Sequence, residues 1–256
     1  MEPHYRRQAF VKGLERAGYT VGETARPADA RDLLVIWNRQ GPDELRANEW
    51  EQRGGTVVVA ENGYFGRDAD GRQLYAISVH GHNGSGWFHQ GDGDRFTPLC
   101  IELAPWRQSG PPLVCAQRGI GSARMASPRQ WDQKTVSTLR RMGFAKARVR
   151  QHPGRYKVTT PLDQDLAGAG VCVIWSSAAG LRALQLGVPV VYTAPHWIGA
   201  EAASRGLGTV LAPLRDDAAR LRAMRHAAWG QRTVAEIESG EPFATILEHL
   251  AEVKWS

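Results

Sequence analysis

The sequence predicts an α/β protein built from two successive domains in which parallel strands alternate with helices. Two observations indicate this class. Short aliphatic runs at 33–37 (LLVIW), 56–60 (TVVVA) and 171–175 (VCVIW) have the length and composition of strands that are buried on both faces. Segments with helical periodicity that end at glycine or proline separate such runs, as helices do in a parallel sheet.

The first predicted domain covers residues 1–108 and opens with a helix. Phe10, Val11 and Leu14 share one helical face, and Gly18 follows as a natural stop. The elements expected here are a helix at 5–17, a short strand at 19–21, a strand at 33–37, a helix at 43–52 and a strand at 56–60. Such a domain usually begins with a strand, so either that strand is absent or the short one pairs at an edge.

Residues 62–104 interrupt this alternation as a glycine-rich insert. The insert is rich in Gly, Asp, His and aromatic residues, and its strand-like piece is at 74–79. We expect loops that carry function in such a segment. The prolines and glycine at 105–112 are typical of a linker between domains.

The second predicted domain covers residues 109–256 and returns to alternating strands and helices. Its elements are a strand at 113–116, a helix from Trp131 to Met142, a strand ending at Arg150, a strand at 171–175, a helix containing Leu181 and Leu184, a strand at 188–191, an apolar run at 209–211, and two helices containing Leu221 and Phe243. Both domains are therefore expected to be Rossmann-like.

The chain is basic, with a formal net charge of +6 at pH 7 and a pI of about 9.5. This balance favours an anionic partner such as a nucleotide, a nucleic acid or an acidic glycan. The bases occur in scattered pairs such as Arg6-Arg7 and Arg140-Arg141, so an arginine-rich surface without a partner is the alternative.

We expect a cytoplasmic protein that contains reduced cysteines. No apolar stretch is long enough to span a membrane, and the N-terminus lacks the apolar core of a secretion signal. Cys100, Cys115 and Cys172 are an odd number of cysteines, without a CxxC pair or neighbouring histidines. They are expected in the core, bound neither to each other nor to a metal.

Three polar motifs follow predicted strands of the second domain, and each has chemistry that suits a phosphate. They comprise Gln117, Arg118, Gly119 and Gly121 after the first strand, Arg150, His152 and Pro153 after the second, and Ser176, Ser177 and Ala178 after the third. Arginine offers a bidentate cation, histidine a directional donor, and a serine-capped helix start offers backbone N–H groups. Loops that follow parallel strands lie along one edge of the sheet, so we expect the three motifs to converge there.

Each motif also has a purely structural interpretation. Ser176 and Ser177 would then form an ordinary N-cap, His152-Pro153 a turn, and Arg118 one side of a surface ion pair. The sequence leaves both interpretations open.

The order and spacing of these motifs resembles the donor-binding domain of glycosyltransferases with the two-domain GT-B fold. The passage at 172–192, with SSAA followed by LGVPVV, is similar to the nucleotide-sugar motif of that family. The run from Arg150 to Gly154 resembles the His-Pro motif of sialyltransferases and capsule-polymer transferases. The whole chain also resembles short glycosyltransferase-like proteins of tailed phages, and the family resemblance is best over residues 113–200.

The resemblance implies two Rossmann-like domains whose parallel sheets face each other across a cleft. It also implies transfer of a sugar from a nucleoside diphosphate, with UDP as the expected nucleotide, to an acceptor hydroxyl. For a phage-encoded enzyme in the host cytoplasm, the acceptor would be a hydroxymethylated base in DNA. No DxD motif follows a predicted strand, which favours a metal-independent reaction without a cofactor.

The acceptor hydroxyl needs a general base, which we expect from the first domain. Glu61 is the first candidate, because it directly follows the strand at 56–60 and would lie at the edge that faces a ligand crevice. His82 in the insert is the second candidate. A solvated turn carboxylate and a structural loop histidine are the alternatives for these two residues.

Two other functions fit the same residues. The acidic residue that binds ribose in many of these enzymes would fall near Arg182, so a catalytically idle GT-B-like protein that binds DNA or glycan is one alternative. A sugar-nucleotide epimerase or hydrolase is the other. A dinucleotide oxidoreductase is not expected, because no GxGxxG motif follows an early strand.

Overall fold

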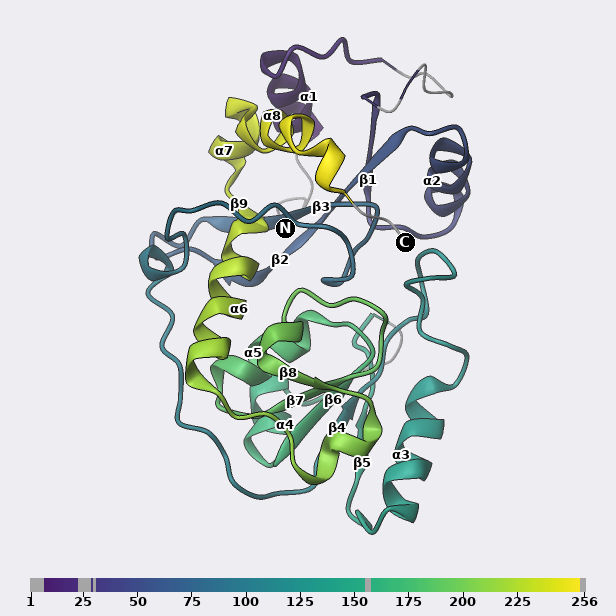
Figure 1. Ribbon diagram of the computed structural model, residues 1–256, viewed down its shortest axis with the longest axis vertical. Coiled ribbons are helices and arrows are strands. Elements are labelled where there is room, and N and C mark those ends of the chain that lie inside the picture. Colours follow the sequence, from purple (N-terminus) through teal and green to yellow (C-terminus); the bar gives the residue numbers. More distant parts are fainter. Residues whose placement is uncertain (1–6, 23–28, 30, 155–157, 254–256) are drawn as a thin grey trace. The chain divides into compact units, whose positions relative to one another are not determined.

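The structure, a computed structural model, describes residues 7–22, 29, 31–154 and 158–253 (Figure 1). The chain forms two compact units. The first contains residues up to 82, residues 86–100 and residues from 226 onward, and the second contains residues 83–85 and 101–225. The predicted α/β class is confirmed, with one parallel sheet and a second sheet.

The sheet of the first unit is mixed, whereas parallel strands were predicted for it. Its strands are β1 (Leu33–Trp37), β2 (Thr56–Arg67), β3 (Gln73–Val79) and β9 (Gln231–Arg232), in the order β1-β2-β3-β9. β1 and β2 are parallel, whereas the other two pairings are antiparallel. The strand predicted at 56–60 continues into the expected insert, where Asp68 accepts hydrogen bonds from the N–H groups of Asp70 and Arg72 and closes a hairpin. Residues 19–21 form no strand.

Helices pack on both faces of this sheet. They are α1 (Arg7–Arg16), α7 (Val234–Ser239) and α8 (Glu241–Glu248) on one face and α2 (Pro42–Gln52) on the other. Val58 of β2 packs with Phe10 and Phe243, whereas its neighbour Val59 packs with Trp50, because successive strand side chains alternate between faces. The C-terminal helices thus complete the first core, although the sequence analysis placed them in the second domain.

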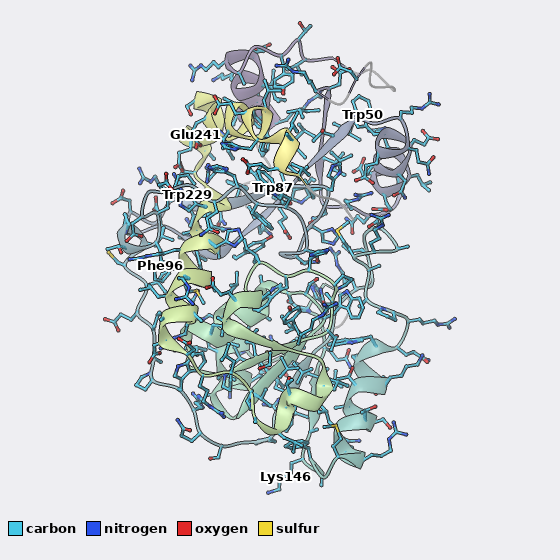
Figure 2. The ribbon with its side chains drawn as sticks, viewed as in Figure 1. Trp50, Trp87, Phe96, Lys146, Trp229 and Glu241 are labelled. Atoms are coloured by element: carbon cyan, nitrogen blue, oxygen red, sulfur yellow. The ribbon has the colours of Figure 1, made fainter. Side chains whose placement is uncertain are left out.

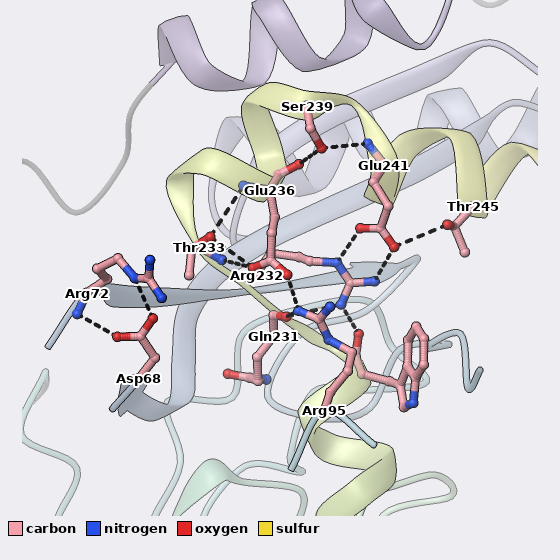
Figure 3. Close-up of polar contacts among 11 residues, drawn as sticks. Asp68, Arg72, Arg95, Gln231, Arg232, Thr233, Glu236, Ser239, Glu241 and Thr245 are labelled. Atoms are coloured by element: carbon pink, nitrogen blue, oxygen red, sulfur yellow. Dashed lines mark hydrogen bonds and ion pairs between the residues drawn. The ribbon is translucent and has the colours of Figure 1, made fainter. Parts of the chain in front are cut away.

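A network of ion pairs fastens the C-terminal helices to the first sheet (Figure 3). Arg232 in β9 is buried and pairs with Glu241 at the start of α8, with Nε and Oε2 2.9 Å apart. Glu236 forms a capping box with Thr233 and also pairs with Arg95. Because a buried guanidinium without its partner is costly, the Arg232 pair makes the position of α8 depend on β9.

All five strands of the second unit are parallel. They are β4 (Pro112–Cys115), β5 (Arg148–Arg150), β6 (Val171–Ile174), β7 (Val190–Tyr192) and β8 (Ala203–Arg205), in the order β5-β4-β6-β7-β8. The helices between them are α3 (Trp131–Arg141), α4 (Leu162–Ala167) and α5 (Ala178–Gln185). The crossover from β4 to β5 runs opposite to that from β6 to β7, so right-handed connections place α3 and α5 on opposite faces (Figure 1). The strand order reverses between β4 and β6, as in doubly wound sheets.

The remaining helical segments are short, apart from α6 (Asp217–Trp229), which begins in the second unit and ends in the first. They are the 3-10 turns η1 (Thr97–Leu99), η2 (Ala200–Ala202), η3 (Leu207–Leu211) and η4 (Leu250–Glu252). The apolar run at 209–211 therefore belongs to η3, and its Val210 packs into the second core. No helix among the described residues has the length and apolar character needed to cross a membrane.

The proline-rich segment predicted as a linker packs against the second unit. The N–H of Ala104 donates to the carbonyl of Gln185, and that of Arg107 donates to the carbonyl of Gly187, both at 2.8 Å. Trp106 stacks on Arg220, whose Cζ lies 4.2 Å from the ring centroid. This segment is therefore an ordered part of the second unit.

The cysteines are free thiols, as predicted. Cys115 and Cys172 are buried in β4 and β6 with their Sγ atoms 3.7 Å apart. The hydrogen bond with Cys115, together with burial, raises the pKa of the Cys172 thiol. Cys100 is exposed, which differs from the predicted core position, because it caps the surface turn η1.

We expect Gly187→Ala to destabilise the chain more than Gly206→Ala. Both glycines have positive φ, +71° and +88°, where alanine costs about 1–2 kcal/mol. A Cβ at Gly187 would also lie 2.0 Å from the carbonyl oxygen of Pro105, whereas one at Gly206 would meet nothing within 4 Å. Urea unfolding should show a further loss of about 1–3 kcal/mol for Gly187→Ala. Equal losses would contradict the packing of the proline-rich segment.

Candidate functional site

The candidate site lies where β4, β5 and β6 end. The three strands are parallel neighbours with β4 in the centre, so the loops that follow them leave the same edge of the sheet. The strand order reverses at β4 and β6, and open α/β sheets bind ligands at such a point. The loops carry the three polar motifs predicted from the sequence.

Gln117 connects the loop after β4 to the loop after β6. Its Oε1 accepts a hydrogen bond from the backbone N–H of Ser176 at 2.8 Å, and its Nε2 donates to the carbonyl of the same residue. The side chain therefore continues the strand pairing beyond the ends of the two strands. Gln117 fixes the backbone of the serine motif, which is a positioning role that the sequence analysis did not distinguish from ligand contact.

Ser176 is buried, with 1% of its surface exposed. Its Oγ lies 2.6 Å from the Oγ of Ser85, which belongs to the short segment 83–85 of the second unit. The N–H of Ile198 donates to the carbonyl of Gly84 in the same segment at 2.8 Å. The hydroxyl of Ser176 is thus used within the protein. Sequence reasoning missed Ser85, because no local pattern relates it to a residue 91 positions away.

Ser177 caps α5 and leaves the start of that helix at the same edge. It has extended backbone angles, and its Oγ accepts a hydrogen bond from the N–H of Ala179 at 3.2 Å. The helix starts at Ala178, whose half-buried position lies at the positive end of the helix dipole. Ser177 therefore has the predicted capping role. The partial positive charge at the N-terminus of α5 lies beside the serine motif.

His152 is half-buried and has a defined tautomer. Its Nδ1 accepts a hydrogen bond from the N–H of Gly154 at 2.9 Å, so the proton of the neutral ring is on Nε2. Burial, and then the positive charges of Arg118 and Arg150, lower the pKa of His152. The ring therefore acts as a neutral donor through Nε2.

Arg118 lies beside this ring. A Cβ placed at Gly154 would be 3.2 Å from the His152 ring and 3.6 Å from Cδ of Arg118. Within the described ranges, the guanidinium of Arg118 takes part in no hydrogen bond or ion pair. An uncompensated cation next to a neutral N–H donor is a combination that binds anions.

Arg150 has a structural role. Its guanidinium pairs with Asp165 and donates to the carbonyl of Thr160 at 3.1 Å. Arg148 pairs with the other oxygen of Asp165 at 2.9 Å, so one carboxylate is shared by two arginines. The remaining predicted positions are backbone features of the same loops, namely Pro153, exposed, and Gly119 and Gly121, which have φ of +68° and +106°.

Two tryptophans hold the long loop after β4 over the sheet edge. Trp175 donates through Nε1 to the carbonyl of Met125 at 2.7 Å, and Trp131 donates to Oγ1 of Thr193 at 2.9 Å. The two indole rings meet edge to face with centroids 6.2 Å apart. These contacts fix the middle of the loop and the start of α3.

Glu61 and His82, the predicted general bases, belong to the first unit. Glu61 does not follow a strand as predicted, because β2 continues through it to Arg67. It is buried, with 7% exposure, and accepts a hydrogen bond from the hydroxyl of Tyr64 at 2.7 Å. His82 lies just beyond β3 and is 2% exposed.

Arg182, the position at which the chain departs from the GT-B pattern, is neutralised. Its Nε and Nη2 donate to the two oxygens of Asp163 at 2.8 and 2.6 Å. Because Asp163 neutralises the guanidinium in this bidentate pair, Arg182 is not a candidate for binding an anionic ligand. In the part of the chain that the structure describes, no three His, Cys, Asp or Glu side chains are grouped to hold a metal ion.

No protein-family model matches the sequence, and no curated protein matches it. Among solved structures, the chain is similar to the beta Kdo 2,7 transferase KpsC of Thermosulfurimonas dismutans, with 14% identity, 93% of this chain and 89% of that chain covered, and a TM-score of 0.49. It is also similar to the beta Kdo 2,4 transferase KpsC of the same organism, with 12% identity, 80% and 86% covered, and a TM-score of 0.44. Both TM-scores lie below 0.5, so the function is argued from the residues of the site.

The tautomer of His152 can be read by NMR. We expect imidazole ¹⁵N shifts to show the proton on Nε2 and the titration midpoint to fall below the ordinary value of about 6.5. Arg118→Gln should move the midpoint upward, since one repulsive charge is lost, but not to the ordinary value, since burial remains. Arg140→Gln, on the exposed side of α3, is the control and should leave it unchanged. A proton on Nδ1, or a midpoint above 6.5, would refute this arrangement.

Loss of the Gln117 amide should destabilise the second unit. Gln117→Met preserves the size of the side chain but leaves the N–H and carbonyl of Ser176 without partners, at a cost of about 2–4 kcal/mol. Gln108→Met is the matched control, because Gln108 is exposed and bonds only locally, so a change within about 0.5 kcal/mol is expected. Denaturant unfolding of both variants measures the difference. Similar values for the two would show that Gln117 does not couple the loops.

Proposed function

We propose that the chain is a glycosyltransferase that binds the phosphates of a nucleotide sugar at the carboxyl edge of the second sheet. The observation that carries the proposal is that Arg118, whose guanidinium has no hydrogen-bond or ion-pair partner among the described residues, lies beside the ring of His152, whose Nε2 carries the proton. The capped start of α5, held close by Gln117, adds backbone N–H groups and a positive dipole end. The motif resemblance to GT-B enzymes supports the same assignment.

These groups suit the departure of a nucleotide. In glycosyl transfer, the bond from the anomeric carbon to the phosphate oxygen breaks, and the oxygen leaves with the electron pair. The negative charge that grows on this oxygen is stabilised by donors that are already oriented, here Arg118 and His152. In this proposal a cation and amide dipoles from the protein neutralise the leaving group, so the reaction is metal-independent. A nucleoside diphosphate, with UDP as the first choice, fits two adjacent donors.

The acceptor oxygen forms the new bond to the anomeric carbon and gives its proton to a base. We propose His82 or Glu61 for this base. His82 directly precedes the segment 83–85, whose Ser85 contacts Ser176 of the serine motif. This adjacency in the chain makes His82 the better candidate, whereas Glu61 lies within a strand and is already bound by Tyr64.

Isothermal titration calorimetry with UDP-sugars and CMP-sugars tests the donor site. Arg118→Ala and His152→Ala should each weaken binding by about 10–150-fold, since each loses one charged or charge-assisted hydrogen bond worth about 1.5–3 kcal/mol. Arg140→Ala removes an exposed arginine from α3 and should change the affinity less than about twofold. Absence of binding to every nucleotide, or equal affinity in all variants, would overturn the proposal.

Product analysis separates transfer from the related reactions. Mass spectrometry of a nucleotide sugar incubated with the protein alone would detect an altered sugar if the protein is an epimerase, or free sugar if it is a hydrolase. Transfer requires an acceptor, so we expect the donor to remain largely intact until an acceptor is added. A nucleotide that binds but never turns over would favour the idle binding protein.

A further inference from the structure

Positive charge is concentrated in the stretch from Arg118 to Arg150. The 33 positions contain seven arginines, two lysines and one acid, Asp132. This stretch therefore carries an excess of eight positive charges, whereas the rest of the chain has 23 bases and 25 acids. The basic character of the protein thus comes from the loop after β4, α3 and the approach to β5.

Helix α3 presents three of these nine bases on its solvent side. Its inner face contributes Trp131, Val136 and Leu139 to the core of the second unit. The outer positions include Lys134, Arg140 and Arg141, all exposed, and the exposed Arg129 and Lys146 flank the helix. The side chain of Lys146 projects away from the ribbon (Figure 2). We call these five residues, Arg129, Lys134, Arg140, Arg141 and Lys146, the basic surface.

The bases of this surface are not neutralised by the protein. None of Arg129, Lys134, Arg141 or Lys146 forms an ion pair with any residue that the structure describes. Some exposed arginines elsewhere do pair, as Arg72 does with Asp68 and Arg182 does with Asp163. Here several unpaired bases are grouped along one helix and its flanks, so the surface stays positive and suits an anionic partner.

We propose that the basic surface docks the phosphate backbone of double-stranded DNA. An 11-residue helix is about 16 Å long, and one strand of a duplex presents a phosphate about every 3.4 Å along its axis. About five phosphates therefore lie along the length of α3, which carries three of the five bases, and Arg129 and Lys146 extend the basic surface beyond its two ends. Arginine, which supplies three of the five, fits phosphate with its planar fork of donors.

Other polyanions fit this surface less well. A helix that binds a membrane surface needs exposed apolar anchors, but the exposed large apolar residues of the described chain are Val21, Leu45 and Leu211, all outside this region. Single-stranded DNA stacks its bases on exposed aromatic rings, whereas Trp131 is 8% exposed and packs in the core. Contact with the backbone of a duplex needs neither feature.

The basic surface is continuous in sequence with the candidate site. Arg118 begins the stretch, and the start of α3 is bound to the loop after β7 through the hydrogen bond from Trp131 to Thr193. A duplex lying along α3 would therefore reach the carboxyl edge of the sheet. If the proposed function holds, DNA is then the polymer that carries the acceptor hydroxyl, although docking itself does not depend on a donor.

Fluorescence anisotropy with a labelled duplex over a series of salt concentrations tests docking. The slope of log affinity against log salt should be about −4 to −5 for five phosphate contacts, at about 0.9 per contact. Lys134→Ala/Arg141→Ala should make the slope shallower by about 2 and weaken binding by about 10–100-fold at 0.1 M salt. Arg53→Ala/Arg205→Ala, which removes two exposed charges elsewhere, should leave both values nearly unchanged.

Competitors and a second readout keep the outcomes distinct. A sulfated glycan, anionic vesicles and a single strand of equal charge are titrated separately, and tighter binding to any of them than to the duplex would overturn the proposal. An equal loss of affinity for the duplex in Lys134→Ala/Arg141→Ala and in Arg53→Ala/Arg205→Ala would also overturn the proposal. Calorimetry with the nucleotide sugar on Lys134→Ala/Arg141→Ala should match the unchanged protein, so failure of DNA docking and failure of donor binding are observed independently.

Discussion

The side-chain amide of Gln117 joins two loops at the point where the strand order of the parallel sheet reverses. Strands β4 and β6 pair through their backbones, and beyond their ends the amide binds both the N–H and the carbonyl of Ser176. This contact sets where Ser177 caps α5, and it holds the neighbouring Arg118 on the same edge. The candidate site therefore depends on a residue that satisfies the backbone and need not touch a ligand.

The positions of a few acids decide which cations remain available. Asp165 pairs with both Arg148 and Arg150, and Asp163 pairs with Arg182, whereas Arg118 has no such partner within the described ranges. The sequence analysis placed all the loop residues of the second unit near one another, because each follows a strand. It could not assign their separate roles, since the pairing of Arg150 with Asp165 and of Ser176 with Ser85 depends on tertiary contacts.

Most helices and strands could be predicted from the sequence, but the way in which the first unit is assembled from them could not. The aliphatic runs of β1, β4 and β6, the proline and glycines that bound α2 and the periodicity of α3 identified those elements within a few residues. Glycines in β2 concealed a strand that continues through Glu61, because Gly63 and Gly66 resemble loop residues when read locally. The return of α7 and α8 to the first core also has no local signature, since Phe243 fits any apolar partner and finds Phe10 only in the folded chain.

We propose above all that the carboxyl edge of the second sheet binds the phosphates of a nucleotide. A crystal structure of the protein with a bound nucleotide sugar tests this most directly. We predict phosphate oxygens within hydrogen-bond distance of the guanidinium of Arg118, Nε2 of His152 and the backbone N–H groups at the start of α5. Phosphates bound at another surface, with this edge occupied only by solvent, would contradict the account.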